Sequence, residues 1–127
     1  DRGRLIKADG LTVYGKPKLV AEVLPRDSFY PDRSGRVLWL DGRAYATDVD
    51  DWELRKWRHG DRMRPFGMRG SRLVSDILTD AKVSALEKQN VWVLVYRGDI
   101  VWVVGVRCSC YFAVTPESRE VVRIALG

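Results

Sequence analysis

Two neighbouring apolar segments near the end of the chain constrain the fold more than any other feature. Val91–Tyr96 and Ile100–Val104 are separated only by Arg97-Gly98-Asp99, a sequence typical of a tight turn. Strands that are apolar at consecutive positions are normally buried on both faces. The sequence therefore predicts a hairpin in the middle of a two-layered core.

The rest of the pattern predicts short strands with a pair of helices. Asp-Gly dipeptides between apolar runs predict hairpin turns at 9–10 and 41–42, because Asp-Gly tolerates positive φ. Further predicted strands cover 53–57, 108–114 and 121–126; 18–24 is a strand or a short helix, and 25–35 a loop or linker. Ser71 is expected to cap one helix, and the capping box of Ser84 and Glu87 a second through Asn90. These elements predict an α+β fold with an antiparallel β-sandwich-like core and two short helices packed on one side.

Length and apolar content favour a soluble folded chain. The 127 residues can form one domain or two small lobes, and 46% of them are hydrophobic. No apolar run approaches the ~20 residues of a membrane span, so no membrane partner is expected. Because the chain begins with Asp rather than Met and has no leader pattern, we expect a piece of a longer protein.

The positive charge of the chain is concentrated in one segment. Residues 55–72 carry seven basic side chains and one acidic side chain, which equals a net charge of +6, whereas the whole chain carries +5. Glycines and a proline interrupt this segment, so we expect it to form turns rather than a helix. Six of the seven basic residues are Arg, whose planar guanidinium matches phosphate geometry. The segment therefore predicts a nucleic-acid or phosphate partner.

Two other readings of the sequence stay open at this point. The arginines could instead pair with Asp76, Asp80 or the acidic turn 48–53 as a structural network. The chain could also be a protein-interaction module in which exposed Trp and Tyr make the contact. A dimer of the chain is compatible with either reading.

Catalytic and metal signals are weak. The sequence has neither a phosphate-cradling glycine loop nor a Ser-His-Asp pattern. The aspartates at 48, 50 and 51 could hold a metal, but they are more typical of a solvated turn. Cys108 and Cys110 are read as buried small apolar residues rather than as half of a metal site. His59 is a candidate base or, between two arginines, a neutral hydrogen-bonding group.

The stretches Trp57–Met68 and Ser71–Val83 resemble the C-terminal domain of bacterial tRNA(Ile)-lysidine synthase, and Ile100–Arg107 and Tyr111–Thr115 resemble the end of that domain. The resemblance implies a domain at 54–127, preceded by a β-rich linker or small subdomain at 1–53. It also implies a fold related to the phenylalanyl-tRNA synthetase β subunit (PheT/TilS-like).

The function implied by this resemblance is tRNA binding. The family's enzyme is a cytoplasmic ligase that uses ATP, with Mg, to join lysine to the wobble cytidine of an isoleucine tRNA. Its catalytic N-terminal domain carries a Ser-Gly-Gly-x-Asp-Ser loop, which this chain lacks. We therefore expect the chain to be inactive alone, to need no cofactor, and to grip the tRNA acceptor stem.

The resemblance also suggests which side chains would contact RNA. The family often has Arg-Phe-Lys where this chain reads Tyr111-Phe112-Ala113, so two charges are missing there. The remaining candidates are His59 and the residues at positions that are usually basic in the family: Arg58, Arg62, Arg64, Arg69, Arg72, Lys82 and Arg107.

Overall fold

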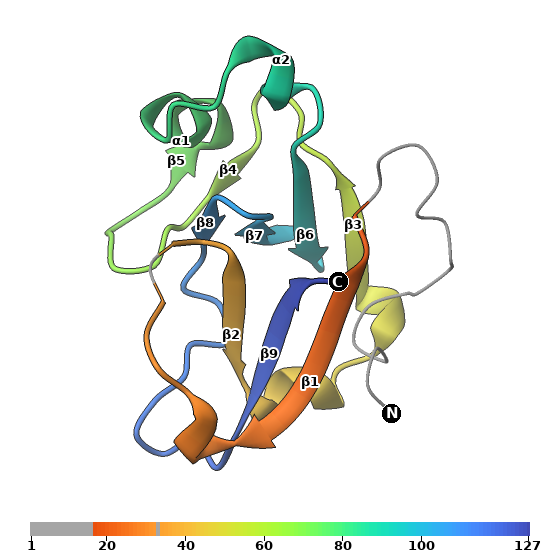
Figure 1. The fold of residues 1–127 in the computed structure, drawn as a ribbon, viewed down its shortest axis with the longest axis vertical. Helices are drawn as coiled ribbons and strands as arrows, with labels where there is room; N and C mark the ends of the chain where they lie inside the picture. The colour runs from red at the N-terminus through yellow and green to blue at the C-terminus, as the bar shows by residue number, and fades with distance from the viewer. Residues whose placement is uncertain (1–16, 33) are drawn as a thin grey trace.

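The computed structural model describes residues 17–32 and 34–127, which form two β-sheets and two short helices (Figure 1). The smaller sheet has the order β1 (Leu19–Pro25), β9 (Glu120–Leu126), β2 (Val37–Asp41). The larger sheet has the order β3 (Trp52–Lys56), β6 (Trp92–Tyr96), β7 (Asp99–Val103), β4 (Arg62–Met63), β5 (Arg72–Leu73), and β8 (Arg107–Cys108) pairs with β7. Every pairing is antiparallel except that of β4 with β7.

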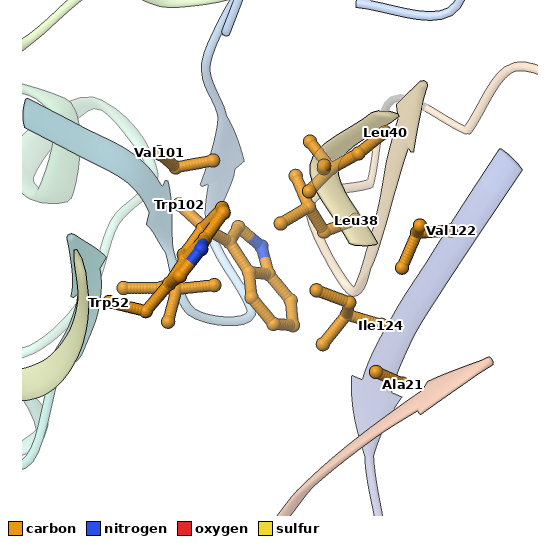
Figure 2. Packing of buried hydrophobic residues seen from close by; sticks show 10 residues of the cluster. Ala21, Leu38, Leu40, Trp52, Val101, Trp102, Val122 and Ile124 are labelled. Atoms are coloured by element: carbon orange, nitrogen blue, oxygen red, sulfur yellow. The ribbon is translucent and has the colours of Figure 1, made fainter. Parts of the chain in front are cut away.

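The predicted apolar hairpin is confirmed as β6 and β7, and one face of it packs against the smaller sheet. Trp102 lies fully buried between the two sheets, facing Leu38 and Ile124 (Figure 2). Its indole nitrogen donates a 2.8 Å hydrogen bond to the carbonyl oxygen of Gly35. The packing of two sheets around this core gives the sandwich-like arrangement.

The other face of the hairpin is covered by α1 (Val74–Asp80). Val74, Ile77 and Leu78 of this helix are buried with Val93 and Val103 in a second apolar cluster. The second helix, α2 (Ala85–Lys88), begins with the predicted capping box of Ser84 and Glu87. The α+β prediction is therefore confirmed, with both helices at the same end of the larger sheet (Figure 1).

The predicted hairpin at Asp41-Gly42 is wrong. The chain leaves β2 as a 3₁₀ helix, η3 (Gly42–Ala46), because the Asp41 carboxylate accepts a hydrogen bond from the backbone N–H of Arg43 at 2.9 Å. β9 pairs along one edge of β2, and at the end of the strand the N–H of Asp41 donates to the carbonyl oxygen of Phe112. The chain around Phe112 therefore contacts the end of β2, where a hairpin with the segment 43–47 would have begun.

The expected strand at 108–114 ends after Cys108. Phe112 adopts a φ of 52°, which turns the chain and brings its ring to 5.1 Å from the ring of Tyr96 and 5.9 Å from that of Trp52. Aromatic packing at the edge of the core takes precedence over continued strand pairing here.

Ser71 does not cap the first helix. Residues 72–73 first pair with β4, so the helix starts at Val74, whose N–H donates to the carbonyl oxygen of Asp61 at 2.8 Å. A hydroxyl can cap a helix only when it immediately precedes the first turn. The start of α1 is therefore determined by the β4–β5 pairing.

Strands on both sides of residue 53 share a sheet. β9 pairs with β1 over seven positions and with β2 over five. The segment 18–24 is thus a strand, and 25–35 connects two strands of one sheet around the short 3₁₀ helix η2 (Arg26–Ser28). The boundary at residue 53 stays a prediction, and the Asp9-Gly10 turn lies outside the described residues. No helix in the described part of the chain is long and apolar enough to cross a membrane.

Candidate nucleic-acid interface

The basic segment 55–72 runs from the end of β3 through β4 to β5, with a turn before β4 and a longer loop after it (Figure 1). Gly60, Gly67 and Gly70 all have positive φ, in agreement with the prediction that this segment forms turns. The loop is held to the core by backbone contacts. Phe66 N–H donates to the Cys108 carbonyl oxygen at 3.0 Å, and Cys110 N–H donates to the Arg64 carbonyl oxygen at 3.1 Å.

One arginine of the segment is part of the folding framework. Arg55 makes a bidentate contact with the Asp61 carboxylate, at 2.9 and 3.1 Å, and the backbone N–H of Arg58 donates to the same carboxylate at 2.7 Å. Burial would raise the pKa of Asp61, but these hydrogen bonds and the two positive charges outweigh it and hold that pKa below its usual value. Asp61 therefore stays ionised and fixes the turn before β4.

Two further arginines have local partners. Arg62 donates through Nε to the Ser71 hydroxyl at 2.9 Å, which joins the two ends of the loop without neutralising the guanidinium. Arg72 forms a salt bridge with Asp80 at the end of α1. The alternative of a structural ion-pair network thus applies to Arg55 and Arg72, and Asp76 has no salt bridge with any described residue.

The other arginines of the segment are exposed and unpaired. Arg58, Arg64 and Arg69 make no side-chain hydrogen bond or salt bridge with any described residue. All three lie on the turns of the segment rather than within a strand. Positive charge that is neither buried nor neutralised is available to an anionic partner.

The remaining candidates lie around this segment. His59 is exposed, and its ring packs against Trp57 at 4.8 Å. Lys82 is exposed and comes after the end of α1. The helix is about 10 Å long and separates Lys82 from β5. Arg107 is half-buried at the start of β8, beside the loop 65–68. The structure therefore brings Arg107 to the basic loop and leaves Lys82 at the far end of the helix.

Two hollows adjoin the loop after β4. Arg62 and Arg64 line the smaller one, of about 250 Å³, with Asp99 and Tyr111 opposite. Burial, the charge of Asp99 and a hydrogen bond to it raise the pKa of Tyr111, so its phenol is protonated at neutral pH. Because its one O–H proton is engaged with Asp99, the phenol oxygen beside the two guanidinium groups is left as an acceptor.

The larger hollow, of about 490 Å³, contains the functional candidates that sequence reasoning missed. Phe66 and Met68 line it from the loop. Trp39 lines it from β2 of the smaller sheet, and Phe29 from the connection before β2. Phe66 is 55% exposed and Met68 44%. Apolar side chains interleaved with arginines in a glycine-rich turn were the signal that could have identified them.

The other candidate residues from the sequence are the acidic turn at 48–51 and the two cysteines. The Asp48 carboxylate accepts from Asp50 N–H at 2.9 Å and caps η4 (Val49–Asp51), and Asp51 forms a salt bridge with Arg97. The described residues include no cluster of three potential metal ligands. The two cysteines differ: Cys108 is half-buried, in partial agreement with the prediction, whereas Cys110 is exposed, contrary to the prediction, because the chain turns away from the sheet after β8.

This difference predicts selective chemistry at the two thiols. Burial raises the pKa of Cys108 to about 11, so this thiol is protonated at neutral pH and is a weak nucleophile. In the folded chain iodoacetamide is expected to alkylate Cys110 and spare Cys108, and in denaturant to alkylate both; peptide mass mapping reports the two sites. Equal labelling of both thiols in the folded chain would contradict the burial of Cys108.

Known proteins match this chain over the region that contains the basic segment. Residues 52–125 match the family model described as "TilS substrate C-terminal domain". A tRNA(Ile)-lysidine synthase of Parabacteroides distasonis is 41% identical over 91 residues, which cover 72% of this chain and 20% of that protein. One of Geobacter sulfurreducens is 43% identical over 113 residues, which cover 87% of this chain and 23% of that protein.

A solved structure supports the fold. A crystal structure described as the TilS C-terminal domain superposes with a TM-score of 0.66 at 20% sequence identity, and covers 89% of this chain and 86% of that one. The chain spans about a fifth of the length of the two relatives named above (20% and 23%).

Proposed function

The chain belongs to the TilS substrate C-terminal domain family, and from that premise we propose that it is the tRNA-holding part of a longer tRNA(Ile)-lysidine synthase. In this proposal the chain binds the acceptor stem of an isoleucine tRNA in the cytoplasm. A separate N-terminal domain uses ATP, with Mg, to join lysine to the wobble cytidine. The sequence of this chain has no glycine loop for ATP, so we propose that the chain alone is inactive.

The observation that supports this proposal most strongly is the set of exposed arginines without ion pairs. Arg58, Arg64 and Arg69 sit on turns that the Arg55–Asp61 pair and the loop's backbone hydrogen bonds hold in place. An RNA stem hides its base edges in a deep groove, so proteins bind it through phosphates, 2′-hydroxyls and shape. Guanidinium groups on a fixed, irregular surface suit that kind of contact.

The partly paired residues complete the proposed surface. Arg62 keeps its charge while bonded to Ser71, and Arg107 adjoins the loop from β8. His59 next to Arg58 is a hydrogen-bond donor or acceptor for the backbone. Arg72 and Lys82 would contribute to the positive potential rather than to direct contacts, because one pairs with Asp80 and the other lies beyond α1.

A protein-interaction module built on exposed aromatic residues is less well supported. None of the five tryptophans is exposed, and Tyr30 is the one strongly exposed tyrosine in the described part of the chain. Neither residue type therefore forms a large contact surface of the kind typical of protein interfaces.

Replacing Arg64 by Ala is expected to weaken binding to an isoleucine tRNA by about 1–2 kcal/mol, or about 5- to 30-fold, because one charge-assisted contact is lost. Arg64 forms no side-chain hydrogen bond or salt bridge with any described residue, so the unfolding midpoint should change little. A fluorescence titration with the tRNA measures the affinity, and thermal unfolding measures the stability. Arg62→Ala should cost a similar amount of affinity.

Arg119→Ala is the matched control, because Arg119 is also exposed but lies in the turn before β9. The affinity of the Arg119→Ala chain for the tRNA should equal that of the unmodified chain. Unchanged tRNA affinity together with a lower unfolding temperature in Arg64→Ala would show that Arg64 has a structural role and would contradict the proposal.

A further inference from the structure

The larger hollow is an aromatic cavity built into the edge of the basic loop. Its volume of about 490 Å³ falls within the range of sites that enclose small molecules, roughly 300–1,000 Å³. Trp39, at 5.4 Å from the ring of Phe29, forms one wall, and Phe66 and Met68 form another. Two sets of flat or polarisable apolar groups therefore face a space of molecular size.

The wall formed by Phe66 is fixed by the backbone. Phe66 N–H donates a hydrogen bond to the carbonyl oxygen of Cys108, and the neighbouring Pro65 forms an isolated antiparallel β-bridge with the buried Ser109. Met68 N–H donates to the Pro65 carbonyl oxygen at 3.2 Å, which closes a turn in which Gly67 has a φ of 82°. Phe66 is thus held in position with about half of its surface facing solvent, where a partner can cover the ring.

The charges around the cavity distinguish between possible occupants. Arg107 lines the cavity, and in the loop the exposed Arg64 and Arg69 lie two residues before Phe66 and one residue after Met68. Asp32 also lines the cavity, and hydrogen bonds from Ser34 lower its pKa, so it is ionised at neutral pH. A carboxylate repels a phosphate but accepts a hydrogen bond from the exocyclic amine of a base.

We propose that this cavity holds an unstacked nucleobase from a single-stranded RNA segment, with the phosphates of that segment against Arg107 and the exposed arginines of the adjoining loop. The inference rests on the proposed function and deepens it, because the acceptor stem of a tRNA continues into a single-stranded 3′ end. The base lies between the Phe66 ring and the Trp39 wall, and stacking of this kind does not require a particular base. Arg107 and the exposed arginines of the adjoining loop bind the backbone that connects this base to the stem.

Two RNAs test the proposal with the whole 127-residue chain. Both are stem-loops with a single-stranded 3′ overhang, and the overhang of one consists of abasic nucleotides, which keep the phosphates but lack the bases. The unmodified chain is expected to bind the base-bearing RNA about 5- to 150-fold more tightly than the abasic RNA. Phe66→Ala should abolish this difference, whereas Phe66→Tyr should retain it.

Leu86→Ala is the control for loss of an exposed apolar side chain, because Leu86 is 74% exposed and lies on α2. It should bind both RNAs as the unmodified chain does. A 2-aminopurine base in the overhang gives a second readout, because its fluorescence should be quenched by the unmodified chain and not by Phe66→Ala.

Equal affinity of the unmodified chain for the two RNAs would overturn the base site and leave stem binding intact. A loss in Phe66→Ala that is the same for both RNAs would also overturn it, because Phe66 would then only shape the loop. Failure of the unmodified chain to bind either RNA would overturn the proposed function itself.

Discussion

Binding of the chain to an isoleucine tRNA is expected to weaken about 1,000- to 10,000-fold when the monovalent salt concentration rises tenfold. Each phosphate neutralised by a cationic side chain releases condensed counterions, so affinity falls with a log–log slope set by the number of such contacts. Four arginines of the basic segment keep their charge at the surface: Arg58, Arg62, Arg64 and Arg69. About four contacts give a slope of roughly −3 to −4.

The measurement is a series of fluorescence titrations with the tRNA at increasing salt. Each Arg→Ala change among these four should make the slope shallower by about one, and Arg119→Ala should leave it unchanged. A slope near zero, or one that is insensitive to Arg58 and Arg64, would show that the concentrated charge of the segment does not contact phosphates.

Replacing Trp102 by Ala is expected to lower the free energy of unfolding by about 3–5 kcal/mol. The side chain is completely buried between the two sheets, so its removal leaves a cavity among Leu38, Ile124 and their neighbours. The carbonyl oxygen of Gly35 also loses the indole donor, which adds the cost of an unsatisfied buried group. This loss is a large part of the ~5–15 kcal/mol that typically stabilises a domain.

Urea unfolding followed by circular dichroism measures the effect. Trp102→Phe retains a ring but no donor and should fall between the unmodified chain and Trp102→Ala. Leu86→Ala, at an exposed position, should stay within about 0.5 kcal/mol of the unmodified chain. A loss below about 1 kcal/mol for Trp102→Ala would be inconsistent with a core shared by both sheets.

The elements that could be predicted are those whose signal is local. The β6–β7 hairpin is indicated by consecutive apolar residues around a short turn, and the start of α2 by Ser84 and Glu87, each of whose side chains accepts a hydrogen bond from the other's backbone N–H within one helical turn. The mistakes occurred where a distant segment competes for the same backbone. The Asp41-Gly42 hairpin fails because Asp41 caps η3 and its backbone N–H bonds to Phe112, which is 71 residues further along the chain.

The candidate site was predicted in part for the same reason. The sequence located the positive charge at 55–72, but it could not distinguish Arg55, which pairs with Asp61, from Arg64, which pairs with no described residue. It also gave no sign that Trp39 and Phe66 line one cavity, since they come from different sheets and loops. Contact with RNA at the candidate residues stays a prediction.

The amino-acid sequence alone determined where charge and hydrophobicity are concentrated, because both are properties of the residues and their order. It thereby defined an apolar hairpin for the centre of the fold and a basic, glycine-interrupted segment for the surface. Only the tertiary structure decided which guanidinium groups are neutralised and which aromatic rings share a cavity. Those outcomes depend on which distant groups come within hydrogen-bond or van der Waals range, and the packing of the two sheets sets those distances.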